Sequence, residues 1–194
     1  MAAEIKIVEE ADKPIGMNPK KFALWLFMAT VVMLFAAWTS AFIVKRGDIG
    51  WAEIIVPDQF WINTVIIVLS SISMIWAVRA ARADRLETVK LALSITSILG
   101  VAFLVGQIFA YKEMIALKEH FTGGNVSHSF VYVLSGVHGV HLISGVIFLL
   151  IVLRATFTYK VHSKNMDLIE MCAMYWHFLD VLWLYLFVFL LVNR

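Results

Sequence analysis

Residues 170–192 read EMCAMYWHFLDVLWLYLFVFLLV. After Glu170, Asp180 is the only Asp, Glu, Lys or Arg in this stretch, and nearly every other side chain is apolar. At about 1.5 Å per residue, a helix of this length crosses a hydrocarbon core of roughly 30 Å. Because lipid cannot satisfy free backbone groups, the stretch predicts a membrane-spanning helix.

Four further apolar runs precede this one, and together the five predict an all-α integral membrane bundle of five transmembrane helices. The polar connections are short, so we expect antiparallel neighbours and a single domain over residues 22–194. Residues 1–21 form a charged N-terminal tail without the apolar core of a signal peptide. The predicted spans are 22–44, 60–78, 89–111, 130–154 and 170–192.

The composition supports a membrane protein. Hydrophobic residues make up 61% of the chain and charged residues 15%, with a mean hydropathy of +0.85. Soluble domains are about half apolar and about one quarter charged. The net charge of +2 is too small to indicate a nucleic-acid partner. One cysteine, Cys172, excludes an internal disulfide, and no Cys/His spacing is typical of a zinc site.

The basic residues predict the orientation. Most Lys and Arg residues fall on the side that carries the N-terminus, which predicts a cytoplasmic N-terminus. Arg79, Arg82 and Arg85, which follow the second span, are the strongest part of this signal. We interpret them mainly as topology residues, and contact with anionic lipid headgroups is the functional alternative.

Small and polar residues inside the spans indicate helix packing. Asn63 on the second span and Gln107 on the third lie on polar stripes of the kind that usually face other helices. Ser135, Gly139 and Gly145 on the fourth span predict a close approach to the fifth. The polar residues are too few along any one helix to favour a water-filled pore.

The last two spans carry the most informative side chains. Asp180 and His141 are expected at the same depth, and an ionised Asp at the bilayer centre costs at least about 2.5–3.5 kcal/mol. Three interpretations compete: a structural polar cluster, a metal or haem site, and a proton relay. The residues alone favour the structural cluster without excluding the others. The cluster comprises His138, His141, Trp176, His177, Asp180 and Trp183.

At these residues the chain resembles subunit III of the haem–copper terminal oxidases, in its five-helix bacterial form. Ser129–Leu150 reads SFVYVLSGVHGVHLISGVIFLL, similar to the family's F-Y-x-L-x-G-x-H-G-x-H-x-x-x-G run. Tyr175–Phe187 reads YWHFLDVLWLYLF, similar to its Y-W-H-F-x-D-x-x-W motif. The likeness continues in PDQFWINTVIIVLSS from Pro57, in LGVAFLVGQIFAY from Leu99 and in the first span from Leu24.

The resemblance implies a non-catalytic core subunit of a respiratory oxidase in the bacterial cytoplasmic (inner) membrane. Such a subunit binds no haem or copper, which belong to subunits I and II. It packs mainly against subunit I, holds phospholipids and supports proton uptake, and its buried polar cluster is then structural. A place in a larger respiratory supercomplex stays open. The alternatives are a quinol oxidase or nitric oxide reductase component and, more remotely, a self-contained b-type haem protein.

Two departures from the family pattern affect what is carried over. Many members have a membrane-buried glutamate where this chain has Val31, so a role of that carboxylate is absent or moved. The seven-helix form has two additional helices and a deep lipid-filled cleft, which the five-helix form does not share in full.

Overall fold

The computed structural model describes residues 18–47, 51, 54, 56–116, 125–158 and 166–193. These residues fold into five long, apolar helices, each able to span a membrane, which confirms the predicted all-α transmembrane bundle. The described part of the chain contains no strand. The helices are α1 (Pro19–Lys45), α2 (Gln59–Arg82), α3 (Leu86–Ala116), α4 (Val126–Phe157) and α5 (Asp167–Val192).

Every predicted span lies inside one helix, and every helix extends beyond its span. The longest are α3 with 31 residues and α4 with 32, more than the roughly 20 that a bilayer core requires. Two of the helices begin with a polar cap: Asn18 accepts from the backbone of Lys20, and Asn125 accepts from that of Ser127. Most of the predicted N-terminal tail, residues 1–17, lies outside the described residues.

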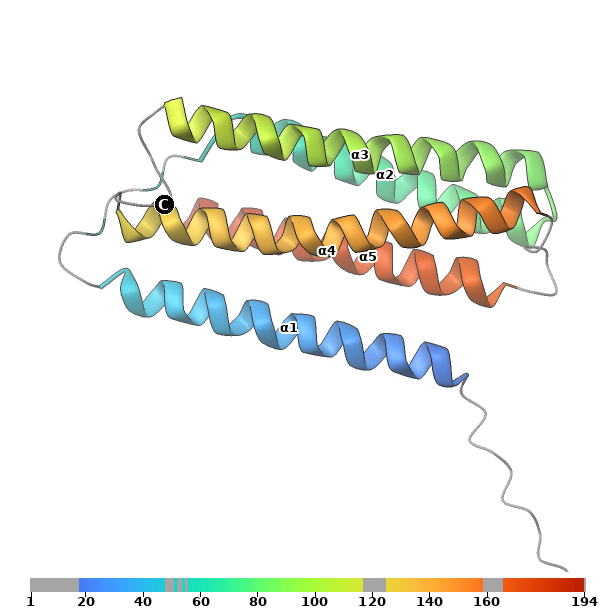
Figure 1. Cartoon of the computed structure of the whole chain (residues 1–194), viewed down its shortest axis with the longest axis horizontal. Coiled ribbons are helices and arrows are strands. Elements are labelled where there is room, and N and C mark those ends of the chain that lie inside the picture. The colour runs from blue at the N-terminus through green and yellow to red at the C-terminus, as the bar shows by residue number, and fades with distance from the viewer. Residues whose placement is uncertain are drawn as a thin grey trace, which may run out of the picture.

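Helices α2, α3, α4 and α5 form a closed four-helix bundle, and α1 lies along one side of it (Figure 1). Each helix of the bundle packs along two of the other three, because α2 packs against α5 as well as against α3, and side chains of α3 and α5 meet across the centre. Within the described residues, α1 contacts only α4 and α5. The core therefore sits among α2, α3, α4 and α5, with α1 as a flanking helix.

The pair α2 and α3 is the most closely packed. Its tight turn contains Asp84, whose φ of 52° is the left-handed conformation that Asp tolerates better than most residues. Alanines lie on both facing sides, and Ser73 Oγ donates to the carbonyl of Ala92 at 3.0 Å. Small residues let the two backbones approach, which is how helices associate within lipid.

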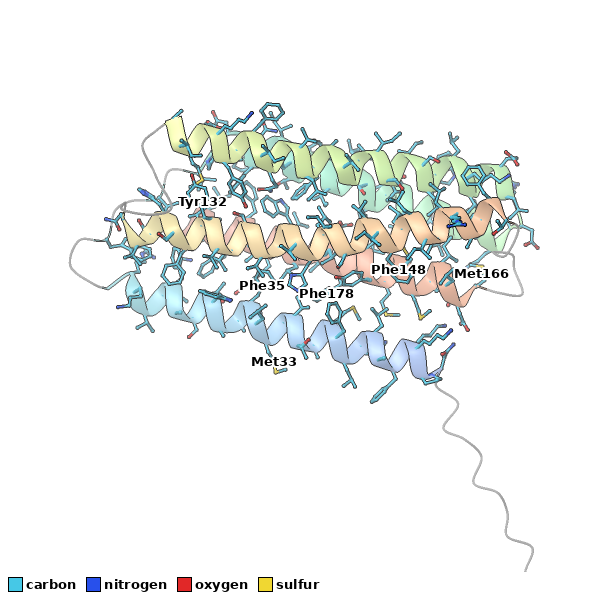
Figure 2. All side chains as sticks on the ribbon, in the orientation of Figure 1. Met33, Phe35, Tyr132, Phe148, Met166 and Phe178 are labelled. Carbon is cyan, nitrogen blue, oxygen red and sulfur yellow. The ribbon has the colours of Figure 1, made fainter. Side chains whose placement is uncertain are left out.

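Helix α1 faces the bundle with one stripe and the surroundings with the other. Phe35 is 1% exposed and points toward α4 and α5, whereas Met33 is 64% exposed and projects from the opposite side of α1 (Figure 2). Tyr185 Oη donates to Thr39 Oγ1 at 3.1 Å, and Lys21 Nζ pairs with Asp167 Oδ1 at 2.8 Å at one end. The cytoplasmic placement of the N-terminus stays a prediction.

Candidate functional site

Trp176 of α5 lies at the centre of the bundle and contacts the other three helices. Its side chain is fully buried, and Nε1 donates a hydrogen bond to Ser70 Oγ of α2 at 3.0 Å. Gly100 of α3 and Gly145 of α4 make room for the ring. A Cβ at Gly100 would lie 2.6 Å from Trp176 Cη2, and one at Gly145 would lie 2.7 Å from Leu179 Cδ1. The two glycines thus permit the approach of α5.

Trp183, seven residues further along α5, repeats this arrangement two turns away. Its Nε1 donates to Thr64 Oγ1 of α2 at 3.1 Å. The ring packs edge-on against Phe60 and Phe103, with centroid separations of 5.3 and 4.9 Å. Such edge-to-face pairs are favoured by the aromatic quadrupole. The α2–α5 contact is therefore set by two indole N–H groups and the rings around them.

His138 of α4 is enclosed by aromatic rings. Its imidazole lies 5.4 Å from the Trp183 ring and 6.0 Å from that of Phe103, centroid to centroid. The residue is 0% exposed, and neither ring nitrogen has a hydrogen-bond partner among the described residues. A buried polar group without a partner costs folding free energy.

We predict that His138→Phe stabilises the protein, because Phe keeps a ring in the aromatic pocket and removes two unpaired nitrogens. The expected gain is about 1 kcal/mol in free energy of unfolding, measured by denaturant titration in mixed micelles. His138→Ala, the matched variant, should destabilise because it leaves a cavity. A destabilised Phe variant would show that a partner of the imidazole exists in the folded protein.

His141 does not join His138, although the two are only three residues apart. Its Nδ1 donates to the carbonyl of Val137 on its own helix at 2.8 Å. Its ring faces α1, with centroids 5.8 Å from Phe35 and 6.3 Å from Phe27. No hydrogen bond or ion pair links it to Asp180 within the described part of the chain. His141 and Asp180 therefore do not pair, and their equal depth stays a prediction.

Asp180 instead lies beside His177 and Ser71. Nδ1 of His177 is 2.7 Å from Ser71 Oγ and 3.8 Å from Asp180 Oδ2. Asp180 is 4% exposed, and neither carboxyl oxygen accepts a hydrogen bond from any described residue. The six residues of the predicted polar cluster thus lie in three separate places.

The polar residues predicted to pack between helices differ in the contacts they make. Asn63 is buried against Gly106, where a Cβ would collide with its amide, and Gln107 is buried with no amide partner among the described residues. Ser135 of α4 contacts α3, because its Oγ lies 3.0 Å from Tyr111 Oη. The same hydroxyl donates to the carbonyl of Val131 on its own helix.

Of the two glycines predicted to bring the last two helices together, only one lies at a close contact. Gly145 faces Leu179 and Trp176 of α5, as described above. A Cβ at Gly139 would meet nothing within 4 Å. The expectation of close packing at Gly139 is wrong, because this residue lies on a different face of α4.

Arg79, Arg82 and Arg85, for which headgroup contact is the alternative to a topology role, are exposed at one end of the bundle. Arg79 and Arg82 line a groove of about 400 Å³ between α2 and α5, together with Glu170 and His177. Arg82 Nη2 lies 3.6 Å from Glu170 Oε1. Arg85 does not line this groove.

The side chains of α2 that bond to α5 were not predicted from the sequence. Thr64, Ser70 and Ser71, which bond to α5, were not among the predicted site residues. The spacing of these residues was a signal. The acceptors Ser70 and Thr64 are six residues apart on α2, and their donors Trp176 and Trp183 are seven apart on α5, in the opposite chain direction. Such a matched spacing is typical of antiparallel helices in contact.

The side chains able to hold a metal or haem iron point in different directions. His138 lies among aromatic rings, His141 faces α1, and His177 faces α2. No group of three or more His, Cys, Asp and Glu side chains is placed to hold a metal ion within the described residues. The fold and these contacts define a multi-pass helical membrane protein whose buried polar side chains mainly join α5 to its neighbours.

Comparison with known proteins gives the family. The family model described as cytochrome c oxidase subunit III matches residues 15–193, so the chain belongs to this family. It is a multi-pass protein of the bacterial inner membrane.

Three relatives show the range of similar proteins. Cytochrome c oxidase subunit 3 of Alkalihalophilus pseudofirmus is 26% identical over 89% of this chain and 85% of its own length. Probable cytochrome c oxidase subunit 3 of Rickettsia bellii is 33% identical over 89% of this chain and 68% of its own. Cytochrome bo(3) ubiquinol oxidase subunit 3 of Buchnera aphidicola is 26% identical over 92% and 89%, respectively. Both kinds of terminal oxidase thus contain similar subunits.

Proposed function

We propose that the chain is a non-catalytic core subunit of a respiratory haem–copper oxidase, with haem and copper held by subunits I and II. On this proposal it stabilises subunit I, holds lipid and supports proton uptake during oxygen reduction. Membership of the subunit III family supports the assignment. The structural observation that favours an accessory role over a haem carrier is that three imidazole rings, those of His138, His141 and His177, face different neighbours.

We assign the contact with subunit I to the exposed faces of α1 and α2. Helix α1 is the least enclosed of the five, and Trp25 and Met33 are more than half exposed on it. On α2, Trp61, Val65 and Ile72 form a similar apolar face. Helices associate in lipid through packing rather than through a hydrophobic driving force, so such faces suit a partner helix as well as lipid tails.

Lipid binding is proposed for the groove that Arg79 and Arg82 line. Two guanidinium groups at the end of a spanning helix suit the phosphate of an anionic headgroup. Glu170 at the same groove weakens this site, since its carboxylate already lies 3.6 Å from Arg82.

The second candidate function is a subunit of a quinol oxidase, in which a quinol replaces cytochrome c as the electron donor. It is favoured by the similarity to a subunit named for ubiquinol oxidation at 26% identity, equal to that of one cytochrome c oxidase relative. Assaying the purified complex with reduced cytochrome c and with a reduced quinol separates the two.

Purification through a tag on this chain tests the accessory role. In mild detergent, haem bands in a reduced-minus-oxidised spectrum are expected with larger partner chains, and they should disappear when those partners are removed. A triple variant, His138→Phe, His141→Phe and His177→Phe, should leave the spectrum of the assembled complex unchanged. A haem band that stays with the isolated chain, and is lost in the triple variant, would overturn the proposal.

A further inference from the structure

The most unusual group in the bundle is the carboxyl of Asp180, which is buried without a hydrogen-bond partner among the described residues. It projects from α5 between Trp176 and Trp183, and both indole N–H groups are already donated to α2. The nearest basic atom is His177 Nδ1, at 3.8 Å, which is beyond hydrogen-bond distance. No lysine or arginine forms an ion pair with Asp180 in the described part of the chain.

A carboxylate in this position would leave a full negative charge unpaired inside an apolar bundle. A neutral carboxylic acid leaves only a hydroxyl and a weak acceptor unpaired, which is much less unfavourable. Buried acids without a close cation therefore keep their proton. The surroundings of Asp180 thus match the neutral form.

His177 connects this buried carboxyl to the surface. Its side chain is 33% exposed and lines the groove between α2 and α5, whereas the Asp180 side chain is 5% exposed. Ser71 Oγ holds Nδ1 of the ring at 2.7 Å and so fixes it on the side of Asp180. One imidazole therefore faces the buried acid and the groove together.

We propose that Asp180 is a proton-binding site and that His177 is the route by which its proton exchanges with the groove. When the Asp180 carboxyl and His177 Nδ1 close from 3.8 Å to hydrogen-bond distance, the O–H bond of the carboxyl breaks as an N–H bond forms on Nδ1. The imidazolium then releases a proton to water at the groove, and uptake reverses these steps. No electrons are transferred, and the site does not depend on the proposed role in the oxidase.

The charged groups around His177 favour release of its proton to the groove. From α2, Arg79 and Arg82 line the groove beside His177, and their positive charge favours release of a proton from the imidazolium. From α5, Glu170 lines the same groove, where its carboxylate lies 3.6 Å from Arg82 and 3.2 Å from Lys21 of α1. From α4, His138 is enclosed and faces Trp183, and His141 faces α1. Helix α3 brings Gly100 and Phe103, which do not titrate.

Infrared spectroscopy of the whole purified complex tests both parts of the proposal. A band of a protonated carboxyl is expected in the wild type and should be lost in Asp180→Asn. Asp180→Glu should shift the band, and it serves if the Asn variant does not assemble. Absence of any carboxyl band that responds to these two changes would show an ionised Asp180 and overturn the proposal.

The exchange route is tested by the rate at which that band shifts after transfer to D2O. His177→Phe should slow the shift by about tenfold or more, the scale on which a positioned proton-transfer group acts. The matched control is His141→Phe, whose ring also lies on the bundle but bonds its own helix and faces α1, and its rate should equal that of the wild type. An unchanged rate in His177→Phe, or equal slowing in both variants, would overturn the assignment of His177.

Discussion

Trp183→Ala is expected to lower the free energy of unfolding by about 3 kcal/mol, the lower end of what loss of a buried Trp costs. The ring is 1% exposed and contacts Phe60, Phe103 and His138, so its removal leaves a cavity lined from three helices. The lower end applies because lipid, unlike water, gives no transfer term for apolar groups. Denaturant titration in mixed micelles measures the change.

Two variants separate the contributions of the ring. Trp183→Phe keeps most of the packing and loses the hydrogen bond to Thr64, so it should cost about 1 kcal/mol. Trp76→Ala is the matched control, because Trp76 is 44% exposed on α2 and its loss opens no internal cavity. If Trp76→Ala costs as much as Trp183→Ala, the α2–α5 contact is not the stabilising element that the structure indicates.

The five helices were predictable because hydropathy and length alone decide them. Apolar runs long enough to cross a bilayer permit only helices, and no tertiary information is required for that conclusion. The ends were less predictable: Lys112 and Glu113 belong to α3 although they lower the hydropathy. A helix that leaves the membrane keeps its backbone hydrogen bonds in water, so polarity marks the membrane boundary and not the end of the helix.

The residues of the candidate site were predictable from their types, whereas the side chains that they contact were not. Trp176, His177, Asp180 and Trp183 were identified because polar groups are rare in a spanning helix. Their partners depend on how α5 is rotated about its axis, which one sequence does not fix. Ser70 and Thr64 carried only a spacing that matches Trp176 and Trp183, and this spacing does not by itself identify α2 as the neighbour of α5.

The contacts of the two histidines on α4 were not predictable either, although these residues lie close together in the sequence. His138 and His141 are three residues apart, so their side chains differ by roughly 60° in direction around the helix axis. That difference is enough to place one against Trp183 and the other against α1. Spacing puts the two on one broad side of α4, and only the positions of the neighbouring helices assign each ring its contact.

Gly100→Ala is expected to destabilise the protein by about 1–3 kcal/mol, although Ala is the better helix former. The added methyl group would lie 2.6 Å from Cη2 and 3.2 Å from Cζ2 of Trp176. The indole cannot turn aside without losing its hydrogen bond to Ser70 and its position beside Gly145. Gly139→Ala is the matched control, because a Cβ there meets nothing within 4 Å, and its free energy of unfolding should be unchanged or slightly higher.

A double-mutant cycle identifies the atom responsible. Trp176→Phe removes Cη2 and Cζ2, the two atoms that the Gly100 methyl would meet most closely on that ring. The combination of Gly100→Ala with Trp176→Phe should therefore be more stable than the two single effects predict, by about 1 kcal/mol of coupling. Additive effects would mean that α3 moves as a whole to accept the methyl group. Coupling would show that the six-membered ring of Trp176, fitted against a bare backbone, sets how closely α3 and α5 approach.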